Sequence, residues 1–586
     1  MKKRTDPSRR EFLKRSAWFA GVSYLNPVKM FVASMATEMI RNSEAFAAGV
    51  NPNPNKFINF HLLMGISRWN MDLPLKHGTG FTPNRSVGTQ ITGTISNTTQ
   101  FLIYQAVNDV RYSNPVLGGI NMPLIWSKSI PTVSVSGTSF AAGTPINLSD
   151  ALASNLMMIM GVDLLVDSHQ IDSRLPTQPV QGQPSITGLL ADQVNTPIPA
   201  IQGWRYDKVQ AYQSATGVPE LSLGDLDWTN PLTKALTPFT GLGSITSLEK
   251  TTISSALDNL FSAMSGDSLL LHKYLPTTYA QRANAKAIFT KNITNLAGTY
   301  DALVSKYKLL IQLSIMGGTG FNKIDHFLPI ELDPVSNSSS TLNAFQINSG
   351  GSRWTGTDFN AAFTNSSVVY SLAQGMALAE YMFTNGFTSV ANILIEHMGG
   401  VTGANPGNND HHFYGAIPST IVTIKQIRAF YACLHELITR FKAVNAGTAP
   451  NGSTLNLFDR TLIQVSGDFN RSARTDMTGS DHGYNGSNYS LHSGMINGIK
   501  LVGKIKNDSG QRGGQATNDY LGSWGLADNL SPSDPQPLRI GRVASTIAAA
   551  LEIPSPTPND HSLVTKGSDG KLVLDPTLPP GGHTST

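Results

Sequence analysis

Continuous apolar runs and helix-like periodic segments alternate along much of the chain. Residues 57–66 and 387–397 are apolar runs typical of buried strands, and residues 461–469 predict another. Apolar positions three and four residues apart predict helices over 366–386 and 420–444, and each helix precedes one of these strands. This order of elements predicts right-handed βαβ units, and so an α/β fold with a mostly parallel sheet covered by helices on both faces.

Other segments modify this picture. The pattern over 245–320 is mostly helical and predicts a helical insertion, whereas the apolar run at 155–166 suits either a buried strand or a helix end. Residues 543–553 predict a short helix, and the Pro-, Gly- and Ser-rich segment 554–586 predicts a flexible tail. We therefore expect one large α/β domain over 48–553 that carries the insertion.

The positive charge of the chain belongs to its N-terminus. The formal net charge is +4, but residues 1–47 hold nine Lys and Arg against four Asp and Glu. The remainder has 34 basic and 35 acidic residues, so its charge is nearly balanced. A nucleic-acid partner is therefore not expected.

The same N-terminal segment has the features of an export signal. "SRREFLK" at 8–14 matches a twin-arginine signal, and "AFAAG" at 45–49 offers a cleavage site after Ala47. The alternative interpretation is that this segment is an amphipathic basic helix of the folded domain. Because Pro27 and Lys29 interrupt the apolar stretch, the sequence does not decide whether the signal is cleaved. We expect a periplasmic or secreted protein. With no other run of about 20 apolar residues, no integral membrane span is expected in the mature chain.

Two consecutive predicted strands end in clusters of carboxylate and imidazole side chains. In open α/β sheets, ligands bind at the carboxyl ends of the strands. Carboxylate and imidazole together suit Zn²⁺, and the carboxylate share also admits Mn²⁺, Mg²⁺ or Ca²⁺. Two such ions would stabilise the attacking and leaving oxygens of a displacement at phosphorus or sulfur. The alternative interpretation is that the clustered residues are solvated loop residues without a ligand. The first cluster contains Asp410, His411 and His412, and the second contains Asp468, Arg471, Asp481 and His482.

The residues around these clusters carry a family resemblance. "AQGMALAEYMFTNGFTSVANILIEH" is followed by "NNDHH", and "GDFNRSAR" is followed by "GSDHGYN". This succession, over about residues 371–504, resembles the domain-of-unknown-function family 1501 (DUF1501). That family has a helix, a strand and then "GWDTH" or "GWDHH", and later "EFGRTP" and "GRDHW". Its members are exported, often by the twin-arginine pathway, and are related to the alkaline phosphatase and sulfatase superfamily. The resemblance implies an alkaline-phosphatase-like fold.

The resemblance also implies roles for the clustered residues. Asp410 and His412 fall on probable metal ligands, with His411 as the alternative to His412. Asp468 falls on the Glu of "EFGRTP", as a metal ligand, and Arg471 falls on its Arg, suited to hold an anionic group. Asp481 and His482 fall on the "DH" pair: His482 binds metal, and Asp481 binds metal or orients His482.

The N-terminal part of the resemblance is looser. In "MGISRWNMD", Asn70 stands where the family has a metal-binding Asp, and Asp72, two residues on, is the substitute candidate. Asn is a poorer ligand, so the number of ions, one or two, stays open. "DSHQIDSR" at 167–174 matches a family "HS" pair at His169, and Ser168 and Ser173 are the candidate nucleophiles.

Together these patterns predict an exported, metal-dependent hydrolase of small anionic phosphate or sulfate esters. The rival prediction is a periplasmic or cell-surface binding or structural protein that keeps the fold but has lost the reaction. Asn70 and the open choice of nucleophile favour the rival.

Overall fold

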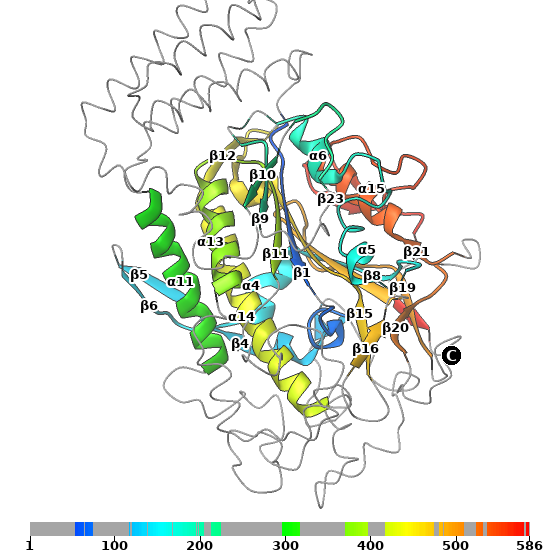
Figure 1. Cartoon of the computed structure of the whole chain (residues 1–586), viewed down its shortest axis with the longest axis horizontal. Coiled ribbons are helices and arrows are strands. Elements are labelled where there is room, and N and C mark those ends of the chain that lie inside the picture. The colour runs from blue at the N-terminus through cyan, green and yellow to red at the C-terminus, as the bar shows by residue number, and fades with distance from the viewer. Residues whose placement is uncertain are drawn as a thin grey trace, which may run out of the picture. The chain divides into compact units, whose positions relative to one another are not determined.

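The computed structural model of the chain (Figure 1) describes residues 53–73, 116–223, 296–316, 370–395, 416–508, 523–530, 536–578 and 582–584, apart from short gaps inside these ranges. The chain divides into two compact units. The unit that carries the sheet comprises Pro52–Val194, Ile198–Thr229 and Tyr300–Thr586. The predicted signal at 1–47 lies outside the described residues.

A nine-stranded sheet forms the centre of this unit, in the order β10-β9-β11-β1-β14-β17-β8-β18, with β21 beside β8. From β10 to β14 all neighbours are parallel, and only β17 is antiparallel to both of its neighbours. The prediction of an α/β fold with a mostly parallel sheet is confirmed. The strands are β1 (Lys56–Leu62), β8 (Leu156–Asp163), β9 (Ala200–Gly203), β10 (Glu220–Leu223), β11 (Val390–Ile395), β14 (Thr461–Gly467), β17 (Ser487–His492), β18 (Lys500–Val502) and β21 (Leu538–Arg539).

Helices pack on both faces of the sheet, because the side chains of each buried strand alternate between the faces (Figure 1). On β1, the Phe60 ring meets Phe430 of α14 with their centroids 6.1 Å apart. Asn59 and His61 are one residue before and after Phe60, so they point to the opposite face, where α6 packs. One face carries α13 (Tyr370–Thr384) and α14 (Ala416–Lys442), and the other carries α6 (Ile186–Ala191) and α15 (Ile540–Leu551).

A buried charge network ties α11 (Leu296–Met316) to α13 and α14. Lys306 of α11 is 1% exposed, and its Nζ lies 2.6 Å from Glu380 Oε2 of α13 and 2.9 Å from Glu436 Oε1 of α14. Helix α11 falls in the predicted helical insertion, and the rest of 245–320 lies outside the described residues.

The C-terminal segment differs from the predicted flexible tail. The antiparallel pair β22 (Val564–Lys566) and β23 (Leu572–Leu574) packs against α15. Leu563 and Leu572 are buried there. The apolar residues of this segment are few, but their burial offsets the entropy cost of ordering the turns between them.

No helix in the described part of the chain is long and apolar enough to cross a membrane.

Candidate functional site

The carboxylate of Asp468 is the centre of the candidate site. This residue follows β14 directly, at the carboxyl end of the parallel strands, and is fully buried. Its Oδ1 lies 2.6 Å from His61 Nε2 and accepts from Ser173 Oγ at 2.6 Å. Its Oδ2 lies 2.7 Å from His169 Nδ1. Side chains from β1, from β14 and from the α5 region therefore meet at one carboxylate.

Asp468 is held in its charged form. Burial by itself raises the pKa of the carboxyl, but hydrogen bonds and charge from His169 and His61 outweigh it and bring the pKa well below its usual range. A buried anion that is hydrogen-bonded in this way orients the imidazoles around it.

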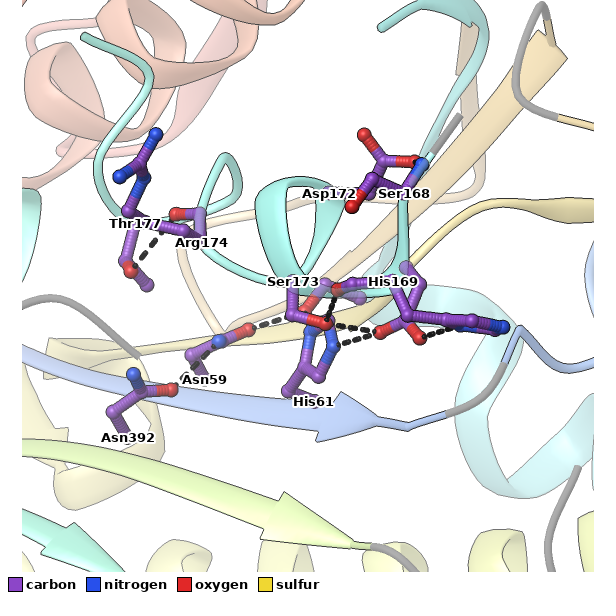
Figure 2. Close-up of polar contacts among 11 residues, drawn as sticks. Asn59, His61, Ser168, His169, Asp172, Ser173, Arg174, Thr177 and Asn392 are labelled. Carbon is purple, nitrogen blue, oxygen red and sulfur yellow. Dashed lines mark hydrogen bonds and ion pairs between the residues drawn. The ribbon is translucent and has the colours of Figure 1, made fainter. Parts of the chain in front are cut away.

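A chain of buried polar side chains runs from this carboxylate along one face of the sheet (Figure 2). His61 Nδ1 lies 2.9 Å from Ser466 Oγ on the neighbouring strand β14. Ser466 Oγ donates to Asn59 Oδ1 at 2.8 Å, and Asn59 Nδ2 donates to Asn392 Oδ1 of β11 at 2.8 Å. The parallel register, which pairs His61 with Ser466 and Asn59 with Asn392, brings these residues side by side.

His169 is the exposed member of the site. It opens α5 (His169–Asp172), and its side chain is 25% exposed, whereas those of His61 and Asp468 are fully buried. Its ring lies 4.7 Å from the Phe469 ring and 4.7 Å from the His482 ring, centroid to centroid. The Phe469 and His482 rings are 4.2 Å apart. These three rings form one cluster beside the carboxylate.

Two short strands, β15 (Asn470–Ala473) and β16 (Ser480–Gly483), pair antiparallel and deliver Arg471 and His482 opposite each other. Arg471 is fully buried; its Nε donates to Gly65 O at 2.8 Å, and its guanidinium carbon lies 5.6 Å from the Phe469 ring centroid. Arg471 is thus a neighbour of the ring cluster, with a backbone contact that fixes the guanidinium.

The two candidate nucleophiles have different surroundings. Ser168 is half-buried at the N-cap of α5, and its backbone N–H donates to Asp172 Oδ2 at 3.2 Å. Ser173 is only 2% exposed, and its single hydroxyl hydrogen has two acceptors within reach, His169 O and Asp468 Oδ1. Of the two, Ser173 lies against the central carboxylate (Figure 2).

Asp72 belongs to a different set of contacts. Its carboxylate lies 2.6 Å from Arg68 Nη2, accepts from Asn488 Nδ2 at 3.0 Å and also accepts from Ser490 Oγ. These partners come from η1 (Arg68–Asn70) and β17. Asn70 ends η1 and is half-buried.

Four predicted metal ligands have no described side chain. Asp410, His411 and His412 lie outside the described residues. Asp481 has its backbone in β16, but its side chain is outside the description. Among the side chains that the structure does describe, no group of three or more His, Cys, Asp or Glu could hold a metal ion.

Sequence reasoning missed His61, Asn59 and Ser466. A signal was present in the sequence, because polar residues recur at every second position of two otherwise apolar strands. These are positions 59 and 61 on β1, and positions 464, 466 and 468 on β14 and directly after it. Buried polar side chains on one face of a strand need partners, and so they indicate a polar site on that face.

Comparisons with known proteins add no relative. No protein-family model matches the chain, and searches of curated proteins and of solved structures return no match. The resemblance to family 1501 therefore stays a prediction.

Proposed function

We propose that the protein is an exported hydrolase of small phosphate or sulfate esters, with its reaction centre at Asp468 and His169. The observation that carries this proposal is a buried, charged carboxylate that holds a partly exposed imidazole at the ligand-binding edge of an α/β sheet. A carboxylate that orients a histidine is a common arrangement in general acid–base catalysis.

The roles follow from the contacts. With its Nδ1–H bound to Asp468, His169 has Nε2 as the nitrogen that takes a proton from the attacking group and returns one to the leaving oxygen. The charge of Asp468 stabilises the imidazolium formed in between. Arg471 supplies positive charge beside the ring cluster, where the anionic group of the ester would lie.

A divalent cation, with Zn²⁺ as the first choice, is part of the proposal. The donor types, a charged carboxylate and the half-exposed imidazole of His482, suit such an ion, and binding it at Asp468 would replace hydrogen bonds that both carboxylate oxygens now accept. Asp468 and His482 would hold the ion, with further ligands where the resemblance puts them, at Asp410 and His412. The ion would supply Lewis-acid stabilisation of the developing negative charge.

One observation favours the rival function, a binding or structural protein. Both oxygens of Asp468 already accept hydrogen bonds, from His61, Ser173 and His169, as they would in a purely structural network. In that case the polar centre stabilises the fold and catalyses nothing.

The two functions separate in one experiment on the exported, folded protein. Bound metal is measured, and hydrolysis of aryl phosphate and aryl sulfate esters is followed with and without chelator. We expect a bound divalent ion and an activity that falls by about 100-fold or more in Asp468→Asn and His169→Gln. His435→Gln, on the far helix α14, is the matched control and keeps its activity. Absence of both metal and esterase activity in the wild type would refute the hydrolase proposal and leave the rival function.

Export is tested separately. Replacing Arg9 and Arg10 by Lys should leave the protein in the cytoplasm, as judged by cell fractionation. Unchanged export of this variant would refute the twin-arginine assignment.

A further inference from the structure

We propose that the buried guanidinium of Arg68 binds a small inorganic anion, of the size of chloride, at a second site on the α14 side of the sheet. This site is independent of the proposed function, since it shares no residue with the reaction centre at Asp468 and His169. Its residues belong to η1 and β17, which contribute nothing to the proposed reaction.

The ion pair of Arg68 and Asp72 lies on the face of the sheet that α14 covers. Arg68 Nη2 is 2.6 Å from Asp72 Oδ2, and Asp72 in turn accepts a hydrogen bond from Ser490 Oγ of β17. Ser490 pairs with Val465, and Val465 pairs with Phe60, whose ring meets α14. Paired residues of neighbouring strands share a face, so the ion pair lies on the side opposite to the candidate site.

The guanidinium of Arg68 has more donors than its contacts use. Arg68 is 1% exposed, and only Nη2 is bound to a carboxylate. Nε and Nη1 are also buried, and neither has a hydrogen-bond partner in the part of the chain that the structure describes. Buried donors without an acceptor destabilise a fold, and more so when they belong to a charged group. An acceptor bound at these nitrogens removes that cost.

The charge on this side of the sheet favours an anion. The carboxylate of Asp72 is shared among three donors, because it also accepts from Asn488 Nδ2 at 3.0 Å and from Ser490. The positive charge of Arg68 still reaches the His492 ring, where it adds to burial in lowering the pKa. Asp72 therefore does not cancel the charge of Arg68 in this direction, and an anion suits the site better than a cation does.

Two aromatic side chains restrict the size of the ligand. Trp126 Nε1 and the Tyr431 hydroxyl both donate to Met71 O, at 2.8 and 3.2 Å, and their rings lie 5.4 Å apart. Met71 stands between Arg68 and Asp72 in the chain, so the rings cover this turn from the α14 side. Both rings are buried, and such an enclosed place suits a monatomic anion rather than a large or polyvalent one.

The site is connected to the turn that carries Arg471. The backbone N–H of Arg68 donates to Asn470 Oδ1 at 3.2 Å, and the same oxygen accepts from the backbone N–H of Arg471 at 2.8 Å. An anion that fixes Arg68 therefore also stabilises the backbone from which Arg471 projects.

The direct test is a crystal of the full-length protein grown in bromide, which replaces chloride and scatters anomalously. We expect an anomalous peak within hydrogen-bond distance of Arg68 Nε or Nη1. Density at these nitrogens without an anomalous signal, as from ordered water, would overturn the proposal, and so would bromide found only elsewhere.

Thermal unfolding tests the same site in solution. Chloride replaces gluconate at constant ionic strength, and an anion that binds only the folded protein stabilises it by mass action. We expect the melting temperature to rise by about 2 °C when chloride is at ten times its Kd. Arg68→Lys keeps a cation for Asp72 but lacks both unpartnered nitrogens, and should lose this dependence.

Arg440→Lys is the matched control, because Arg440 forms an ion pair with Glu436 on α14 and should keep the dependence on chloride. A melting temperature that does not respond to chloride in the wild type, or that responds equally in Arg68→Lys, would refute the site. Should Arg68→Lys not fold, the bromide crystal of the wild type still decides.

Discussion

His492 is a buried histidine whose two ring nitrogens have no hydrogen-bond partner among the described residues. It lies on β17, paired with Ile463 of β14 on one side and Leu156 of β8 on the other. Burial, together with the nearby positive charge of Arg68, lowers its pKa from 6.5 to about 3. The folded protein therefore keeps this imidazole neutral under conditions in which the unfolded chain protonates it.

The sign of the effect on stability follows directly. The unfolded chain takes up a proton as the pH falls through 6.5, and the folded protein does so only near pH 3. Between these values the free energy of unfolding falls by about 1.4 kcal/mol for each pH unit. This loss is close to zero above pH 7, reaches about 2 kcal/mol at pH 5, and is about 4 kcal/mol at pH 3.

The perturbation is His492→Leu, which fills a similar volume and removes the titrating group. At pH 7.5 we expect the variant to be as stable as the wild type or about 1 kcal/mol more stable, because a buried polar group without partners disappears. At pH 5.0 its advantage should grow by about 2 kcal/mol. The measurement is urea denaturation followed by tryptophan fluorescence at both pH values.

The control is His561→Leu, at an exposed histidine. This variant should show no comparable change of its stability difference with pH. If the difference between His492→Leu and the wild type is the same at pH 7.5 and 5.0, the reasoning about a neutral buried imidazole is refuted.

Three further predictions concern the carboxylate, the charge network and the turn after β1. Because the pKa of Asp468 is lowered in the folded protein, its charge stabilises the fold above about pH 4. In acid unfolding from pH 5 to 2, the wild type should therefore lose more stability than Asp468→Asn. Parallel curves of stability against pH for the two proteins would contradict this. Lys306→Met removes the cation between two buried glutamates and should cost about 3–5 kcal/mol in urea denaturation at pH 7, whereas a loss under 1 kcal/mol would show that the network is dispensable. Gly65 has a φ of +67°, and a Cβ there would lie 2.7 Å from the Phe469 ring, so Gly65→Ala should lower the melting temperature and disturb the site; an unchanged melting temperature would mean that the ring moves freely.

The apolar pattern was sufficient to predict the centre of the fold. The runs around Phe60 and Ile393 are buried on both faces, so they read as continuous apolar strands. The helices α13 and α14, each predicted before a strand, form close to the predicted ranges. The choice left open for 155–166 is settled as strand β8, where Gly161, with a φ of +68°, lies against the backbone of Lys504. A side chain at that position would clash, a constraint that apolar periodicity does not report.

The site was predicted only in part because its members come from distant segments. Asp468 and Arg471 stood out as polar residues after a strand, and both lie at the site. His61 did not stand out, because a single histidine inside an apolar run resembles a core residue until its partners are known. Those partners depend on which strands pair and in which register, and that information is spread over about 400 residues of sequence.

The position of β1 in the middle of the sheet has a consequence for how the chain acquires its structure. This strand is the first of the sheet to be synthesised, yet its two neighbours, β11 and β14, follow some 330 and 405 residues later. During translation β1 has neither partner until the ribosome has passed residue 395, and it lacks β14 until residue 467, so the sheet cannot grow progressively from the N-terminus. Its apolar residues need protection from aggregation for that whole interval. We therefore expect folding to be slow, post-translational and dependent on a chaperone that holds the N-terminal segment.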